Sequence, residues 1–336
     1  MKSISPIRQL SAAFFLPLMM CNPCLADPKI YAPTAPVTFD QVPGKQIFFT
    51  VGKPGIPGPE NEGHTSNAGF VITSEGVVVF DALGTPSLGW ALLQQIRRVT
   101  DKPIRYVVVS HYHADHIYGL QALKDHTNAL IVAEERAAEY KENELTVDER
   151  AGQRLSQRRA ALSPWVNENT RIVAPDLTFK ERATINLGGE RFVLLSGAPA
   201  HSSNDAMMLV ESAGVLFTGD IVQNGRIPFM NSDDVSTANW LRALEVVERL
   251  NPVFIIPGHG RPSTNAKEAL TFTRDYIQHV RTQMLGAVES WVDFEAAYSQ
   301  ADWTRYKTFP AFANNNRGNA YRVFLELEQA QIKGQK

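Results

Sequence analysis

His111-Tyr112-His113-Ala114-Asp115-His116 places three imidazoles and a carboxylate in six consecutive positions, although the chain of 336 residues contains only eight histidines. The stretch follows the apolar, β-branched run at residues 104–109, which is typical of a buried strand. His111 and His113 are two residues apart, so in extended backbone both side chains leave the same face and can bind one metal ion. Asp115 and His116 add an oxygen and a nitrogen donor that suit a second divalent ion. A polar loop with incidental histidines is the alternative, and the density of histidines favours a metal site.

Three further polar residues, His201, Asp220 and His259, also lie at the ends of apolar runs. Glycines at positions 197, 219, 258 and 260 allow the backbone to turn sharply where a donor must point inward. Taken singly, His201 and His259 could be ordinary loop histidines, and Asp220 could be a turn residue or a helix cap. Because the three occur in order at strand ends, we expect them to join the His111–His116 cluster as metal ligands.

The motifs together resemble the metallo-β-lactamase superfamily. The resemblance extends over residues 46–261 and rests on His-x-His-x-Asp-His, a histidine after a Gly/Pro-rich strand end, Thr218-Gly219-Asp220 and Pro257-Gly258-His259-Gly260. It implies an α/β fold, a four-layer αββα sandwich with a two-metal site on one edge. The implied ligands are His111, His113 and His201 for the first zinc, Asp115, His116 and His259 for the second, and Asp220 bridging both. Asp81, at the end of the run 77–80, matches a position that supports the ligands by hydrogen bonding.

The resemblance also implies a zinc-dependent hydrolase with a small-molecule carbonyl substrate. Two divalent ions about 3.5–4 Å apart can hold a hydroxide between them, with its pKa lowered toward neutrality. That hydroxide would attack an ester, a thioester or a lactone, and Asp115 would act as the catalytic residue that orients it or relays its proton. His and Asp donors without thiolate also accept iron or manganese.

Asp220 bears on the choice of substrate. β-Lactamases of the superfamily usually carry Cys or Ser at this position, whereas thioesterases and lactonases carry a bridging Asp. The segments 217–222 and 225–229 look like those of exported zinc hydrolases associated with sulfur oxidation and quinoprotein systems. Three alternatives stay open: β-lactam hydrolysis, a mononuclear iron sulfur dioxygenase on the same fold, and a catalytically silent binding module. The complete set of donors counts against the last.

Hydrophobic periodicity predicts the elements around these motifs. We expect strands at residues 46–51, 68–73, 77–80, 104–109, 129–132, 171–173, 177–181, 183–187, 191–195, 206–210, 215–218 and 253–256. We expect helices at residues 86–99, 118–124, 237–250, 262–288 and 319–332. The strands fall into two groups, each followed by helices, which suits a layered α/β domain made of two similar halves.

The chain divides into four predicted segments. Lys2 and Arg8 precede a short apolar stretch. This pattern predicts a signal peptide at residues 1–26 and a periplasmic or secreted protein. Lipoprotein anchoring at Cys21 is a lesser alternative. An extended, Pro-rich arm follows at 27–45, then the metallo-β-lactamase-type domain at 46–262 and a C-terminal helical extension at 263–336. A charged, helical insertion is expected at 134–161.

Composition excludes several classes of partner and bond. Both cysteines, Cys21 and Cys24, lie in the predicted signal peptide, so the remaining chain has no disulfide and no thiolate ligand. The net charge is −2, and loss of Lys2 and Arg8 makes it more negative, which leaves no basic stripe for nucleic acid. No later apolar run approaches the roughly 20 residues of a membrane span. The oligomeric state is left open.

Substrate contacts are expected from two loops that should border the metals. His64 and Asn67 lie in a Gly- and Pro-rich loop at residues 52–67, which has roughly the length of a functional flap. Arg226, in the loop 223–236, could meet an anionic substrate group, and an arginine exposed to solvent is the other interpretation. His126 and His279 lie in or beside predicted helices, and we expect them to be surface or structural residues.

Overall fold

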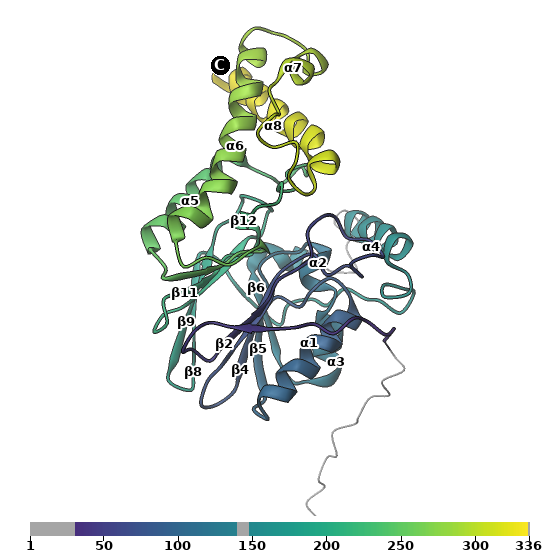
Figure 1. Cartoon of the computed structure of the whole chain (residues 1–336), viewed down its shortest axis with the longest axis vertical. Coiled ribbons are helices and arrows are strands. Elements are labelled where there is room, and N and C mark those ends of the chain that lie inside the picture. The colour runs from purple at the N-terminus through teal and green to yellow at the C-terminus, as the bar shows by residue number, and fades with distance from the viewer. Residues whose placement is uncertain (1–30, 140–147, 335–336) are drawn as a thin grey trace, which may run out of the picture. The chain divides into compact units, whose positions relative to one another are not determined.

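The computed structural model of the chain describes residues 31–139 and 148–334 (Figure 1). From Tyr31 onward the chain forms one unit. The predicted signal peptide, both cysteines, the beginning of the predicted arm and part of the predicted insertion lie outside the described residues. Among the described helices, none is long and apolar enough to cross a membrane.

The first sheet has seven strands that follow the order of the chain. They are β1 (Asp40–Gln41), β2 (Ile47–Thr50), β3 (Ala68–Ile72), β4 (Val77–Phe80), β5 (Ile104–Val108), β6 (Leu130–Glu134) and β7 (Leu177–Phe179). β1 to β4 pair antiparallel, whereas β4 to β7 pair parallel. Parallel neighbours need a crossover, and α1 (Pro86–Val99) and α3 (Leu120–His126) provide two of them.

The second sheet has five strands in the order β13-β11-β10-β9-β8. Their bounds are β8 (Arg182–Leu187), β9 (Glu190–Ser196), β10 (Ala206–Val210), β11 (Val215–Phe217) and β13 (Phe254–Ile256). Only β11 and β13 pair parallel in this sheet, with α5 (Thr237–Leu250) between them in the chain. Two short strands, β12 (Gln223–Asn224) and β14 (His259–Gly260), pair beside it.

Four layers result because the central strands, such as β4, β10 and β11, bury residues on both faces. Inner-face residues of the two sheets form one cluster, in which the rings of Phe80 and Phe217 lie 5.2 Å apart between centroids. The outer face of the first sheet packs against α1 and α3. The outer face of the second packs against α5 and α6 (Ala266–Glu289). The predicted αββα sandwich is confirmed.

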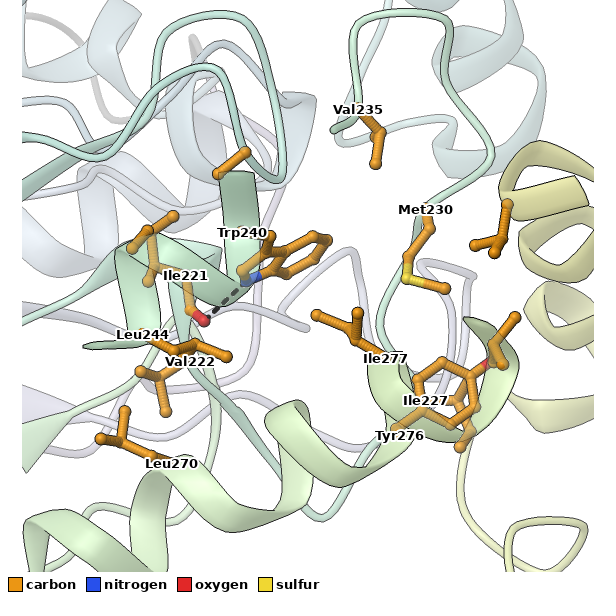
Figure 2. Packing of buried hydrophobic residues seen from close by; sticks show 14 of the residues in the cluster. Ile221, Val222, Ile227, Met230, Val235, Trp240, Leu244, Leu270, Tyr276 and Ile277 are labelled. Carbon is orange, nitrogen blue, oxygen red and sulfur yellow. Dashed lines mark hydrogen bonds between the residues drawn. The ribbon is translucent and has the colours of Figure 1, made fainter. Parts of the chain in front are cut away.

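Three helices make up the C-terminal region, in agreement with the predicted helical extension. α7 (Phe294–Gln300) and α8 (Phe312–Gly334) pack against α6. Trp240 of α5 lies at the centre of the cluster that joins these helices to the sheet, and its indole Nε1 donates to the Ile221 carbonyl at 2.9 Å (Figure 2). This bond ties the helical layer to the turn that carries Asp220.

Local signals explain where helices begin. Thr85 caps α1 by accepting a hydrogen bond from the Leu88 amide at 3.1 Å, and Pro86 occupies the first turn. The helix predicted at 262–288 starts later, because Asn265 caps it at the Glu268 amide. The helix predicted at 319–332 starts earlier, at Phe312, and α7 was not predicted.

Other boundaries depart from the expectation for physical reasons. Residues 171–173 form no strand, because the Arg171 amide donates to the side chain of Gln121 and not to a neighbouring strand. The predicted insertion 134–161 is helical where it is described, with a 3₁₀ turn η1 (Glu135–Glu139) and helix α4 (Asp148–Leu162).

Leu194→Ala tests the interface between the sheets, where this side chain is fully buried. We expect the free energy of unfolding to fall by about 2–5 kcal/mol, because transfer energy and packing are both lost. Urea denaturation followed by circular dichroism measures the change. Leu285→Ala makes the same substitution on α6 where the side chain is 43% exposed, and it should cost less than about 1 kcal/mol. Equal losses would contradict the buried position of Leu194.

Candidate metal centre

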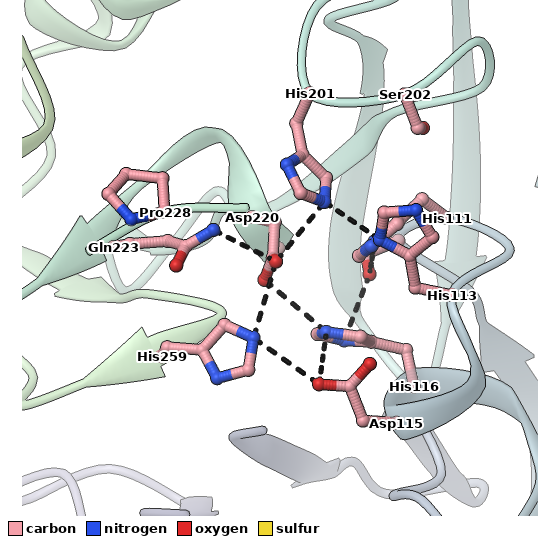
Figure 3. A network of polar contacts seen from close by, with 12 residues as sticks. His111, His113, Asp115, His116, His201, Ser202, Asp220, Gln223, Pro228 and His259 are labelled. Atoms are coloured by element: carbon pink, nitrogen blue, oxygen red, sulfur yellow. Dashed lines mark hydrogen bonds and ion pairs between the residues drawn. The ribbon is translucent and has the colours of Figure 1, made fainter. Parts of the chain in front are cut away.

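Seven donor side chains converge at one edge of the sandwich, beyond the carboxyl ends of strands from both sheets (Figure 3). His111 and His113 follow β5, and Asp115 and His116 lie on the short helix α2 (Ala114–Ile117) that comes next. The other three follow β9, β11 and β13: His201, Asp220 and His259. The structure therefore brings together every residue that the sequence nominated as a ligand.

The donors form two groups. In each group one ligand atom per residue lies within 4.8 Å of the others. The first group contains His111, His113, His201 and Asp220, and the second contains Asp115, His116 and His259. Asp220 also faces the second group: its Oδ1 is 3.3 Å from His116 Nε2, and its Oδ2 is 3.2 Å from His259 Nε2. One carboxylate thus lies between the two groups.

Hydrogen bonds at the rear of the rings set which nitrogen points inward. His116 Nδ1 lies 2.8 Å from Asp81 Oδ2, and His259 Nδ1 lies 2.6 Å from the Thr65 carbonyl, so both Nδ1 atoms donate. Ser110 Oγ donates to Asp81 at 2.8 Å and so accepts from His111 Nδ1 at 2.9 Å. In all three rings Nδ1 carries a proton, so Nε2 is the inward-facing atom that can bind a cation.

Two ring nitrogens, one from His201 and one from His113, face each other at the centre. His201 Nε2 lies 2.9 Å from His113 Nδ1 and 3.2 Å from Asp220 Oδ2. Burial lowers the pKa of His113 well below its usual value and that of His201 to about 4, so both rings are neutral at neutral pH. Neutral imidazoles that converge on a carboxylate are a donor arrangement that a divalent cation satisfies.

The carboxylates are ionised. Burial alone would raise the pKa of Asp220, but His259, His116 and His201 hold it well below its usual range. Burial acts in the same direction on Asp115, and His116 and His259 lower its pKa in net. His111, His113 and His201 are thus neutral beside ionised carboxylates. Burial lowers the pKa of His116, but Asp220, Asp81 and Asp115 raise it well above its usual value in net, so this ring gives up a proton when a metal ion binds.

The donors fit a cation on a second count, which is the state of the buried atoms. His111 Nε2, His116 Nε2 and Asp220 Oδ1 are inaccessible to solvent and make no hydrogen bond with any described residue. A buried polar atom without a partner is costly, and such atoms are rare in folded proteins. Coordination would satisfy all three. The residues present therefore fit the metal ions that the sequence predicts.

Asp81 supports this arrangement as expected from its position after β4. Its backbone has a positive φ of 60°, and its Oδ1 accepts from the Ser110 amide at 2.7 Å while its Oδ2 faces His116. Sequence reasoning did not nominate Ser110, Thr65 or Gln223. Gln223 Nε2 donates to Asp220 Oδ2 at 3.0 Å. Their only sequence signal was adjacency: Ser110 precedes the histidine cluster, and Gln223 comes three residues after Asp220.

The three residues proposed for substrate contact have different positions. Asn67 uses its amide within the protein, accepting from Gly52 and donating to the Pro257 and Gly260 carbonyls, so it has no donor left for a substrate. His64 lies near Thr50, with 3.5 Å between Nε2 and Oγ1, and burial lowers its pKa to about 4. Arg226 is 7% exposed, so it is not the solvent-exposed arginine of the alternative interpretation.

A cavity of about 500 Å³ opens beside the donors. His113, Asp115, Asp220 and His259 form part of its wall, so a ligand in it would reach both donor groups. Arg226 also lines it, whereas His64 and Asn67 do not. The remaining wall comes from the 52–67 loop, α4, Phe229 and the start of α8.

The fold has known counterparts. The family model for the metallo-beta-lactamase superfamily matches residues 61–259. Acyl-coenzyme A thioesterase MBLAC2 of Homo sapiens is 30% identical over 215 residues, which cover 59% of this chain and 74% of that protein.

Two alkylsulfatases are also similar to the chain. The linear primary-alkylsulfatase of Pseudomonas sp. (strain ATCC 19151) is 23% identical over 247 residues, covering 64% of this chain and 46% of the relative. The solved structure of the stereoselective inverting sec-alkylsulfatase Pisa1 from Pseudomonas sp. superposes with a TM-score of 0.64 at 16% identity, covering 86% of this chain and 50% of that one. The chain thus spans about half the length of these two proteins.

Gly258→Ala tests the close approach on which Asp220 depends. A Cβ at position 258 would lie 2.0 Å from Asp220 Oδ1, 2.6 Å from the Gly219 carbonyl carbon and 2.7 Å from the Asp220 nitrogen, so the carboxylate and the turn that carries it must move. We expect the purified variant to hold fewer metal ions per chain after dialysis, by elemental analysis, with an unchanged circular dichroism spectrum. Gly286→Ala is the matched control, because a Cβ there meets no atom within 4 Å. Equal metal content in both variants would contradict the role given to this contact.

Asp81→Asn tests the hydrogen bonds behind the donors. An amide cannot accept from the Ser110 amide, the Ser110 hydroxyl and His116 Nδ1 as the carboxylate does. We expect metal affinity, measured by competition with a chelator, to fall about 10–100-fold while the fold persists. Unchanged affinity would show that Asp81 does not orient His116.

Proposed function

The chain belongs to the metallo-β-lactamase superfamily, and we propose that it is a hydrolase that uses two zinc ions to cleave an ester, a thioester or a lactone. The observation that carries this proposal is the position of Asp220 between the two donor groups. A carboxylate in contact with both groups suits a pair of ions that share a ligand. His111, His113 and His201 would hold one ion, Asp115, His116 and His259 the other, and Asp220 would bridge them.

When bound, two divalent ions lower the pKa of a water molecule and polarise a carbonyl oxygen. The chain's own contribution begins with Asp115. Its Oδ2 accepts from Thr65 Oγ1 at 3.2 Å and lies 3.4 Å from His259 Nε2, so the carboxylate is fixed beside the second donor group. An ionised carboxylate held there can orient a nucleophilic water and take up its proton. Gln223, bonded to Asp220, keeps the shared carboxylate from rotating.

Two features support acyl substrates. One relative is named as an acyl-coenzyme A thioesterase, and the match covers 74% of its length. Position 220 is Asp, whereas β-lactamases of the superfamily usually carry Cys or Ser there. β-Lactam hydrolysis is therefore the alternative to be excluded by assay. A mononuclear iron sulfur dioxygenase is the other, and the presence of both donor groups favours the two-metal hydrolase over it.

Hydrolysis of an alkyl sulfate ester is a second candidate. Two alkylsulfatases are similar to the chain, one in sequence and one in fold. The same donor groups and cavity would serve this reaction with a sulfate ester in place of a carbonyl ester.

We also propose that residues 1–26 are a signal peptide and that the enzyme acts in the periplasm or outside the cell.

Elemental analysis of the purified protein, combined with a substrate panel, tests the proposal. The panel comprises a thioester, a lactone, a β-lactam and an alkyl sulfate. We expect two zinc ions per chain with turnover of the thioester or lactone. One iron per chain would select the dioxygenase, and turnover of the β-lactam or the alkyl sulfate alone would select that reaction. Full activity in a chelator-treated, metal-free preparation would exclude a metal-dependent mechanism.

His113→Ala and Asp220→Ala test the ligands individually. We expect each variant to lose one or both metal ions and at least about 100-fold in kcat/KM, because the donor groups lose a member. Circular dichroism shows whether the fold persists. His279→Ala is the matched control: this histidine is remote from the centre, with its Nε2 bonded to the Asp302 carbonyl on the surface. Activity retained in Asp220→Ala would contradict the bridging role.

A further inference from the structure

Three arginines line the cavity beside the donor groups: Arg154, Arg158 and Arg226. We propose that they recognise an oxyanion, such as a carboxylate, sulfate or phosphate, on a substrate whose other part is apolar. This inference rests on the proposed hydrolase function and names its substrate class.

Arg226 is the most deeply placed of the three. It is 7% exposed, and its Nε and Nη1 donate to the Gly55 carbonyl at 3.1 Å and to Gln223 Oε1 at 3.2 Å. No carboxylate of the described residues lies within ion-pair distance of it. The guanidinium is held by neutral acceptors on two sides, and its Nη2 has no hydrogen-bond partner among the described residues. A buried cation without a paired anion is costly, and an anionic ligand would compensate it.

Arg154 and Arg158 come from the same face of α4, four residues apart. The Arg154 guanidinium lies over the Tyr112 ring, 4.7 Å from its centroid, and Tyr112 is itself fixed by a 2.8 Å hydrogen bond to Asp234. Arg158 is close enough to act electrostatically on both Asp115 and Arg226. The helix therefore directs two cations toward the cavity that Arg226 enters from the opposite loop.

The charges of the cavity wall favour an anion. Asp115 and Asp220 are the acidic residues of the wall, and both are members of the donor groups. Once they are engaged by cations, they no longer offset the arginines. Burial lowers the pKa of Arg226; Asp115 and Asp220 raise it, and repulsion from Arg158 lowers it. A bound oxyanion between the guanidinium groups removes this repulsion and accepts several charged hydrogen bonds.

The rest of the wall is apolar. Ile56 and Pro57 of the 52–67 loop, Ala161 of α4 and Phe229 line the cavity. Phe229 also contacts the ring of His113, with 5.9 Å between centroids, so the apolar wall reaches the first donor group. A volume of about 500 Å³ accommodates a small amphiphile. Its oxyanion would meet the arginines, and its scissile group would lie near the donors.

Binding of a non-hydrolysable probe tests the inference without relying on turnover. We would measure thermal denaturation of the metal-loaded protein with 1-octanesulfonate or with methyl octyl sulfone, which has a similar shape and no charge. We expect the sulfonate to raise Tm more than the sulfone, and this difference to decrease with added salt because the interaction is electrostatic. Arg158→Gln and Arg226→Lys should reduce the difference by at least half.

Arg249→Gln is the matched control, since it removes one positive charge from a side chain that is 68% exposed on α5. It should leave the difference unchanged. An equal effect of sulfonate and sulfone, or a sulfonate effect that persists in both cavity variants, would overturn the inference. A sulfonate effect that disappears with a chelator but not with the arginine substitutions would also overturn it, because the metal alone would then bind the anion.

A kinetic comparison separates the substrate class from the proposed reaction. The substrates are the octanoyl thioesters of 3-mercaptopropanoate and of 2-mercaptoethanol, which differ in the charge of the thiol part. We expect the anionic thioester to have the higher kcat/KM, and its advantage to fall about tenfold in Arg158→Gln, mainly through KM. Equal kcat/KM for both would overturn the inference and leave thioester hydrolysis intact. If neither is cleaved, the thioester proposal fails and the binding experiment decides the anion site.

Discussion

The buried carboxylate of Asp220 is the constraint on which the rest of the centre depends. It is buried and ionised, and it faces histidines from three different strand ends. An ion of this kind is tolerated in an interior only when cations or donors surround it. The close approach of Gly258, the hydrogen bond from Gln223 and the tie from Trp240 to the turn at Ile221 all maintain its position. The sandwich supplies these neighbours because its parallel strands end at the same edge.

Much of this could be predicted from sequence, and the reason is the local character of the signals. The ligand motifs each occupy a few residues after an apolar run, so strand, turn and donor are read together, and α1, α5 and β10 were predicted at their observed bounds. The predictions that were wrong depended on residues that are distant in the sequence. The strand expected at 171–173 is absent because the Arg171 amide donates to the Gln121 side chain. Asn67 donates to backbone carbonyls about 190 residues away in the sequence. Arg154 and Arg158 lie in the segment predicted as a charged, helical insertion, and only the tertiary fold shows that they line a cavity.

The wall of the cavity contains both members of the donor groups and the three arginines. Its donor edge follows the strands of the two sheets, whereas its arginines belong to α4 and to the loop at 223–236. These segments lie outside the sheets, and such segments are where hydrolases on one fold differ in substrate. Chemistry and selectivity are therefore carried by different layers of the molecule, and a substitution in α4 can alter one without the other.

Asn67 has a consequence for how the protein matures. Its amide joins a loop of the first half to the carbonyls of Pro257 and Gly260, which flank the last donor of the second half. Contacts so distant along the chain are slow to form, since a long segment must first be ordered. Each sheet is built from one stretch of the chain, β1 to β7 and β8 to β13, and the donors cannot converge until the two sheets have packed together. Metal uptake during refolding should thus lag behind secondary structure, and the lag would report the docking of the halves.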